Sequence, residues 1–352
     1  MVQSYQQSPA SVENGLDRRQ NCATTLRLIH PVTERPMENR RRLVREGFSI
    51  GIRKGWAGFL WMMKILVPIS LFTALLAWSG LIERSNFLIQ PLLSWLRLPA
   101  MAALPLLIGM LTGIYGGIAS MAVLPLTREQ MTLVAIFLLT AHNLIQEGVI
   151  QGKSGLHPLK ATLFRLLAAV VTVMVSGRLL EVSPDVPAAG AAGLARGSQS
   201  FTAMLLAWLR TTAVLSAEIF AIIMSLLTLL QILKALGWID RIVQALRPLL
   251  RAFGLSDKAG ILWMTAAIFG LAYGAAVIVE EAKEGYLGKD ELEVLHLSIG
   301  INHSLIEDPA LFLAFGLSPF WLWVPRIITA VIAVRLFTWW QTAVKARLSA
   351  TP

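Results

Sequence analysis

The sequence predicts an all-α, polytopic membrane protein built from two tandem homologous repeats. Hydrophobic residues make up 55% of the 352 residues and charged residues only 15%, whereas a soluble domain carries about 25% charged residues. Several apolar runs approach the ~20 residues that a helix needs to cross a bilayer. Matching residues also recur in the same order in the two halves of the chain. We expect about eight transmembrane or re-entrant helices, together with amphipathic helices at the membrane surface.

The charge distribution predicts how the chain sits in the membrane. The net charge is +10, and much of the excess lies between Arg18 and Lys54, before the first apolar run. By the positive-inside rule this predicts a cytoplasmic N-terminus in contact with membrane lipid. The first 40 residues contain no apolar segment of a secretory signal. We therefore expect a multi-pass protein of the cell inner (plasma) membrane with no nucleic-acid partner. Cys22 is the only cysteine, which excludes a disulfide within the chain.

Composition divides the chain into five parts. Residues 1–44 are polar and basic and predict a mobile cytoplasmic tail. Residues 45–182 form the first membrane repeat and residues 201–342 the second. Between them, residues 183–200 are rich in Ala, Gly and Pro, a composition typical of a linker. Residues 343–352 form a C-terminal tail.

The first repeat predicts its own order of helices. The expected elements are a first span from about 41 to 80, a short amphipathic helix at 87–96, and spans at about 100–123, 129–150 and 158–175.

The second repeat matches the first at nearly constant spacing, which is the sequence signature of an internal repeat. Four spans per repeat would make the two repeats parallel, whereas one re-entrant segment in each would make them inverted. The charges of the loops weakly favour the inverted arrangement. The matches are Gly80 with Gly237 and Pro91 with Pro248 at 157 positions, Tyr115 with Tyr273 at 158, Glu147 with Glu307 at 160, and Arg165 with Arg326 at 161.

Two polar stretches lie in apolar surroundings and are the candidate site. In continuous helices, residues four apart share a face, so Asn143 would lie beside Glu147 and His303 beside Glu307. We expect the two glutamates to approach each other, where close carboxylates would share a proton or bind a cation. The candidate binding residues are His142, Asn143, Gln146, Glu147, Asn302, His303, Glu307, Asp308, Glu218, Tyr115 and Tyr273.

Three chemistries fit these residues, and the sequence leaves all three open. Glu147, His303 and Glu307 could bind a divalent cation, a histidine and a glutamate could relay protons, or the polar groups could bind an organic solute such as a nucleoside. The alternative is that the polar groups only lock helix packing. Glu218 either adds a third carboxylate or lies near the membrane surface. Tyr115 and Tyr273 favour close helix packing over a cavity-lining role.

The tandem layout resembles the nucleoside-recognition, or Gate, domain family, found in concentrative nucleoside transporters, the membrane part of ferrous-iron transport protein B, and spore maturation proteins. His142-Asn143-x-x-x-Glu147 and Asn302-His303-x-x-x-Glu307 carry the resemblance, over about residues 45–180 and 200–342. It implies a multi-pass transporter or gate in the inner membrane. No GTP-binding domain precedes the membrane part, and the additional helices of a full nucleoside transporter are missing. We therefore expect neither complete protein, and the substrate does not carry over.

Together these observations predict a membrane transporter or permease for a small polar solute or cation, with its site between the two repeats. The alternative is a membrane scaffold or accessory subunit whose polar core is structural. We do not expect an enzyme, because neither an HExxH helix nor an activated-serine pattern is present. No cofactor is expected with certainty, and a divalent cation at the polar stretches is the candidate. Membrane lipid and the small solute or cation are the expected partners, and a homo-oligomer stays open.

Overall fold

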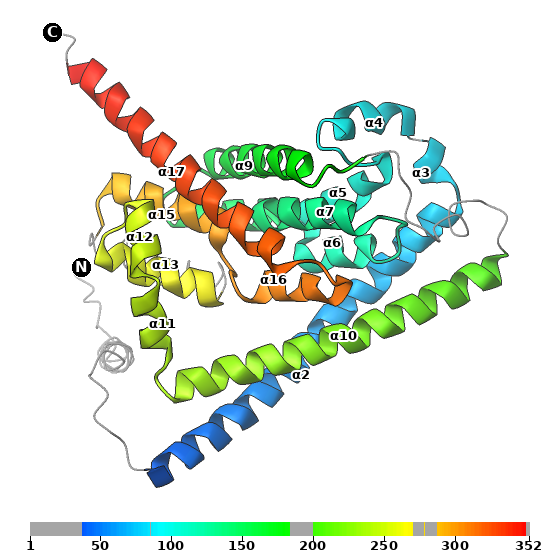
Figure 1. Cartoon of the computed structure of the whole chain (residues 1–352), viewed down its shortest axis with the longest axis horizontal. Helices are drawn as coiled ribbons and strands as arrows, with labels where there is room; N and C mark the ends of the chain where they lie inside the picture. The colour runs from blue at the N-terminus through cyan, green and yellow to red at the C-terminus, as the bar shows by residue number, and fades with distance from the viewer. Residues whose placement is uncertain (1–36, 85, 184–199, 270–277, 279–286, 350–352) are drawn as a thin grey trace, which may run out of the picture.

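The computed structural model describes residues 37–84, 86–183, 200–269, 278 and 287–349 (Figure 1). Within these ranges every regular element is helical, as the sequence predicts. Five helical segments are long and apolar enough to cross a membrane: residues 40–78, 128–153, 158–179, 201–235 and 319–347. The expected tail before residue 37 and most of the expected linker lie outside the described residues.

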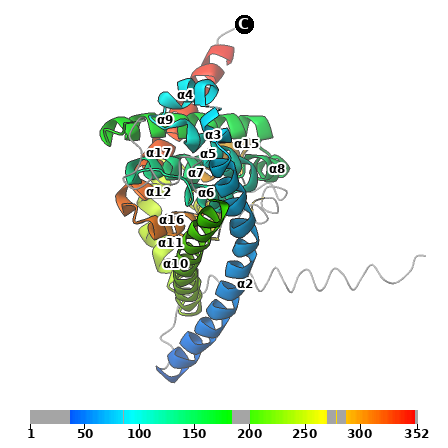
Figure 2. The same cartoon turned by 90° about the vertical axis from the view of Figure 1, so that its right-hand side faces the viewer.

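The two longest helices form an antiparallel pair along one side of the molecule (Figures 1 and 2). They are α2 (Met37–Trp78) and α10 (Phe201–Ala235). The end of α2 meets the start of α10, where the rings of Trp78 and Phe201 lie 5.6 Å apart. Near the other end, Gly51 faces Thr228 so closely that a Cβ on Gly51 would lie 2.4 Å from the Thr228 Cα. Helices in lipid associate largely through such close contacts between small residues.

Short helices follow each member of this pair. They are α3 (Leu81–Arg84) and α4 (Asn86–Ser94) after α2, and α11 (Ile239–Ala245) and α12 (Arg247–Phe253) after α10. Helix α4 lies where an amphipathic helix was expected. Its side chains Phe87, Leu88 and Leu92 are exposed, as interfacial residues that contact lipid would be.

The expected continuous span at residues 100–123 is wrong. The structure has a 3-10 turn at Ala100–Ala102, then α5 (Ala103–Thr112) and α6 (Ile114–Met121). Gly113 separates the two helices with φ of 100°, a conformation that other residues rarely adopt. The chain folds back there, because a Cβ on Gly117 would lie 3.3 Å from the carbonyl oxygen of Pro105. An apolar run long enough to span is thus a hairpin of two short helices.

The expected continuous span at residues 129–150 is also wrong, because two helices share it. Helix α7 (Arg128–Ala141) ends at the first polar stretch, and α8 (Leu144–Lys153) begins after it. A short turn at residues 154–157 leads into α9 (Pro158–Leu179). Helix α7 is the most central element of the fold and contacts α5, α9 and α17.

The described part of the second half contains further helices after α12. Its elements are α13 (Asp257–Phe269), α15 (Lys289–Asn302), α16 (Glu307–Phe312), a 3-10 turn at Leu313–Phe315, and α17 (Pro319–Ser349). The second polar stretch interrupts the helical run between α15 and α16. Helix α17 continues to Ser349, so most of the expected C-terminal tail is helical.

The close approach of α2 and α10 yields a stability prediction. In Gly51→Ala, the new methyl group must displace the backbone of α10, and overpacking of this kind costs about 1–3 kcal/mol. The matched control is Gly58→Ala on the same helix, where a Cβ would lie 3.7 Å from the nearest side-chain atom of Leu227. That distance is ordinary contact, and alanine favours a helix by about 0.5–1 kcal/mol over glycine.

We expect Gly51→Ala to lower the melting temperature of the purified protein, and Gly58→Ala to leave it unchanged or raise it. Equal effects of the two substitutions would contradict the close packing at Gly51.

Candidate functional site

Two helix breaks place the histidines at the centre of the molecule. Helix α7 ends at Ala141, His142 is extended, and Asn143 adopts the left-handed conformation with φ of 48°. In the second half α15 ends at Asn302, His303 is extended, and the next residue has φ of 46°. The two breaks contact each other, since the imidazole rings lie 4.9 Å apart.

Backbone hydrogen bonds from short helices support both breaks. The N–H of Asn143 donates to the carbonyl oxygen of Gly109 on α5, 2.9 Å away. The N–H of Ser304 donates to the carbonyl oxygen of Ala266 on α13, 3.3 Å away. Because these bonds satisfy groups that leave the helical pattern, the chain can bend at two buried positions.

Two buried arginines bind the carbonyl groups at the ends of the broken helices. Arg165 on α9 donates to the carbonyl oxygens of Thr140 and His142, at 3.1 and 2.9 Å. Arg326 on α17 donates to the carbonyl oxygens of Ile301 and His303. The final turn of a helix leaves such carbonyls without helical partners, so each guanidinium caps one break.

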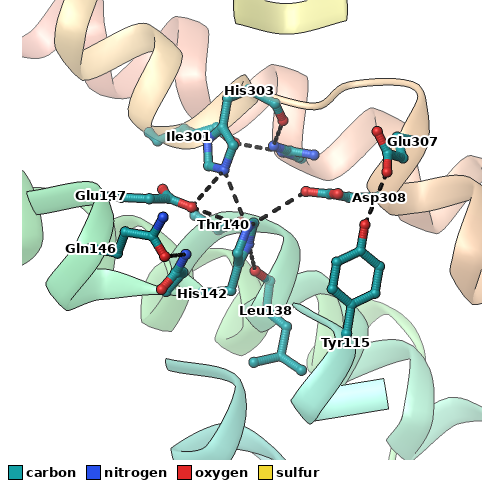
Figure 3. A network of polar contacts seen from close by, with 12 residues as sticks. Tyr115, Leu138, Thr140, His142, Gln146, Glu147, Ile301, His303, Glu307 and Asp308 are labelled. Carbon is teal, nitrogen blue, oxygen red and sulfur yellow. Dashed lines mark hydrogen bonds and ion pairs between the residues drawn. The ribbon is translucent and has the colours of Figure 1, made fainter. Parts of the chain in front are cut away.

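Four side chains then converge between the breaks, as Figure 3 shows. The Nε2 atoms of His142 and His303 lie 3.3 Å apart, and each lies 3.2 Å from Oε1 of Glu147. Oδ2 of Asp308 lies 3.6 Å from Nε2 of His142. All four residues are buried. We call these four residues the central cluster. Three of them, His142, Glu147 and His303, form a group whose ligand atoms lie close enough to hold one metal ion.

Glu147 makes a second ionic contact on its other oxygen. Oε2 of Glu147 lies 2.6 Å from NH1 of Arg165. The carboxylate therefore pairs a guanidinium with one oxygen and meets the two imidazoles with the other. An ion pair at this depth is held against a large desolvation cost, so losing one partner is strongly unfavourable.

Tyr115 and Glu307 form a polar contact on one flank of the central cluster (Figure 3). The hydroxyl of Tyr115 donates to Oε1 of Glu307 at 2.9 Å. The ring of Tyr115 packs against Trp61 at 5.4 Å. The carboxamides of Asn143 and Gln146 bind each other at 3.0 Å.

The expected pairing of Glu147 with Glu307 is wrong. It assumed continuous helices, in which Asn143 shares a face with Glu147 and His303 with Glu307. The second helix breaks between His303 and Glu307. The first breaks at Asn143 itself, which is left-handed and only caps the helix that carries Glu147, so neither pair lies on one face of a continuous helix. The break at Ser304 turns Asp308 toward His142, while Glu307 contacts Tyr115 instead.

The structure places the remaining predicted residues outside the central cluster. Glu218 is exposed on α10, so it does not supply a third carboxylate there. Asn302 is fully buried next to His303, and neither atom of its carboxamide has a hydrogen-bond partner within the described part of the chain. Tyr273 lies outside the described residues.

The site also contains two arginines that the sequence analysis named only as matching positions of the two repeats. Arg165 and Arg326 are buried within mainly apolar stretches of α9 and α17. A charge inside an apolar helix is costly and usually functional. That signal was present in the sequence at both positions.

The fold and the cluster define a polytopic helical membrane protein with a buried polar centre at two helix breaks. Residues 216–318 match the family model Gate, described as nucleoside recognition, so the chain carries a Gate segment. That segment includes His303 and Asp308 of the central cluster, while His142 and Glu147 precede it.

The chain is also similar to the uncharacterized membrane protein YvoD of Bacillus subtilis (strain 168). The two are 25% identical over 293 residues, which cover 83% of this chain and 93% of the relative. No solved structure matches the chain.

The pairing of Arg165 with Glu147 yields a second prediction. Arg165→Met keeps most of the side-chain volume but removes the charge, and breaking a buried pair costs about 3–5 kcal/mol. The matched control on the same helix is Arg178→Met, where the side chain is exposed and the expected change is within about 0.5 kcal/mol. Stability is measured as loss of helical circular dichroism during denaturant titration.

A double variant separates the ion pair from the cap. Glu147→Gln added to Arg165→Met removes the uncompensated carboxylate, so the double variant should recover part of the lost stability. If the stability lost in the double variant equals the sum of the losses in the two single variants, the pair is not coupled.

Proposed function

We propose that the protein is a membrane transporter or permease for a small polar solute or cation, and that the substrate passes the central cluster. One observation carries the proposal: each half of the chain contributes one interrupted helix, and the cluster forms where the two interruptions meet. Ionisable groups at such a depth mark substrate or ion pathways. Transporter sites are commonly built from discontinuous helices at a repeat interface near the middle of the bilayer.

The proposal includes two homologous halves. Contacts at the first break recur in the second: the Nδ1 atom of His142 faces the carbonyl oxygen four residues earlier, and so does that of His303, 161 positions later (303 − 142). The two arginine caps are also 161 positions apart (326 − 165). Equivalent contacts at equal spacing support a repeated unit. In this register Asp308, not Glu307, is the counterpart of Glu147.

We further propose that the two halves have opposite orientations. Helices α2 and α10 are equivalent, with Gly80 and Gly237 following them at a spacing of 157 positions and the same φ of 71°. They run antiparallel, since Trp78 at the end of α2 meets Phe201 at the start of α10. Equivalent helices that cross a membrane in opposite directions belong to inverted repeats. With basic residues clustered near the start of α2, the N-terminus lies in the cytoplasm.

Inversion gives the cluster two flanks on opposite sides of the membrane. Gln146 and Glu307 are equivalent positions, 161 apart (307 − 146), and each directly precedes a carboxylate of the cluster. An inverted arrangement places one flank toward each membrane surface. A solute moving between the flanks would meet Glu147, His142, His303 and Asp308 midway.

The alternative is a membrane scaffold whose polar centre is structural. The 2.6 Å ion pair between Arg165 and Glu147 favours it, because that contact would stabilise the fold with no ligand bound. The alternative predicts no water access to the cluster.

Cysteine accessibility tests the proposed pathway. In a Cys22→Ser background, which removes the natural cysteine, Gln146→Cys and Glu307→Cys are labelled with a membrane-impermeant maleimide in intact cells and in inverted vesicles. We expect the two cysteines to react from opposite sides, because the flanks face opposite surfaces. Ala135→Cys, fully buried on α7, is the control that should not react. Labelling of both flanks from the same side, or of neither, would contradict the proposal.

A further inference from the structure

Both cluster histidines have one ring nitrogen committed to the main chain. Nδ1 of His142 lies 2.8 Å from the carbonyl oxygen of Leu138, and Nδ1 of His303 lies 3.1 Å from that of Ile299. A carbonyl oxygen only accepts hydrogen bonds, so Nδ1 carries the hydrogen in each ring. In a neutral imidazole the opposite nitrogen, Nε2, then presents a lone pair. Both lone pairs belong to atoms that face the central cluster.

Three acceptor atoms therefore meet without a donor among them. The Nε2 atoms lie 3.3 Å from each other and 3.2 Å from Oε1 of Glu147. One shared proton can join two of these atoms, but it leaves the third facing a lone pair. A cation bonded to all three removes the conflict. Zinc binds His nitrogen and carboxylate oxygen at about 2.0–2.2 Å, and tetrahedral geometry then sets neighbouring ligand atoms about 3.3 Å apart.

A fourth ligand is available on the open side of this triangle. Oδ2 of Asp308 lies 3.6 Å from Nε2 of His142 and has no hydrogen-bond partner among the described residues. Asp308 is nine-tenths or more buried, and a buried carboxylate oxygen needs a partner. Figure 3 shows it pointing toward the two imidazoles.

The surrounding contacts match the usual outer shell of a metal site. Metal-binding histidines commonly donate their other N–H to a backbone carbonyl, and metal-binding carboxylates are themselves hydrogen-bonded. Here both Nδ1 atoms face carbonyl oxygens, and Arg165 pairs with the second oxygen of Glu147.

The same distances discriminate among the substrate classes. Atoms 3.2–3.3 Å apart leave no room for an organic molecule between them, so a nucleoside does not fit inside the triangle. Mg²⁺ prefers oxygen ligands in an octahedron, whereas mixed imidazole and carboxylate ligands suit first-row transition metals.

We infer that the central cluster is a binding site for a divalent transition-metal ion of the zinc type, with His142, His303, Glu147 and Asp308 as ligands. This inference rests on the proposed transport function in one respect: it makes the ion the transported substrate. Two buried guanidiniums accompany the two carboxylates, so with neutral imidazoles the site has no excess negative charge. A site without excess negative charge holds a cation less tightly, so the ion can also leave it, as transport requires.

Equilibrium binding of Zn²⁺ to the purified full-length protein tests the site. We expect about one ion per wild-type chain. In His142→Gln and in Asp308→Asn the affinity should fall at least about tenfold, as lost metal contacts cost that much or more. The matched controls are His157→Gln and Glu218→Gln, whose side chains are exposed outside the cluster and which should bind as wild type does. Equal binding by wild type and His142→Gln would overturn the inference.

A spectroscopic readout on the wild type does not depend on how the variants fold. Titration with Co²⁺ should produce the visible absorption of tetrahedral coordination with nitrogen ligands, and Zn²⁺ should abolish it by competition. Only the pale spectrum of hydrated Co²⁺ would count against the site.

Uptake separates binding from transport. Proteoliposomes containing a zinc-sensitive fluorophore should fill with Zn²⁺ when they carry the wild type or Glu218→Gln, and not when they carry His142→Gln. Stoichiometric binding without uptake would overturn the transport proposal while leaving the metal site in place. Cysteine labelling from both sides without zinc binding would overturn the metal site while leaving the transport proposal in place.

Discussion

Two guanidinium groups satisfy carbonyl oxygens deep inside the protein, and the polar centre depends on this interaction. A helix that stops within a membrane leaves backbone groups without partners, at several kcal/mol for each exposed group. Arg165 reaches from α9 to the end of α7, and Arg326 reaches from α17 to the end of α15. With these carbonyls bound, both helices can end in the middle of the fold.

The breaks in turn decide which side chains meet. In a continuous helix His142 and Glu147, five residues apart, would point in different directions around the axis. The extended His142 and the left-handed Asn143 bring both side chains to one side, where His303 and Asp308 arrive from the other break. A left-handed residue other than glycine costs about 1–2 kcal/mol. The backbone bonds from α5 and α13 offset this strain.

Long helices hold the two halves around this centre. Helices α2 and α10 pack along their length, and α9 meets α17 on the other side of the core, where the hydroxyl of Thr172 donates to that of Thr329 at 2.8 Å. Aromatic contacts between Phe164 and Phe337, with rings 6.2 Å apart, extend that interface. Helices α9 and α17 therefore also reach the polar centre directly, because they carry the two capping arginines.

The sequence by itself determined the all-helical membrane class and the Gate resemblance, because apolar length and buried polar residues are local properties of the chain. It also singled out the two polar stretches, including His142, Glu147, His303 and Asp308. Only the tertiary structure decided that those helices break and that Asp308 rather than Glu307 joins the cluster. The contacts that stabilise each break come from residues more than twenty positions away, such as Arg165 to the carbonyl of His142. A local pattern does not contain such contacts, so a broken helix and a continuous one look the same in the sequence.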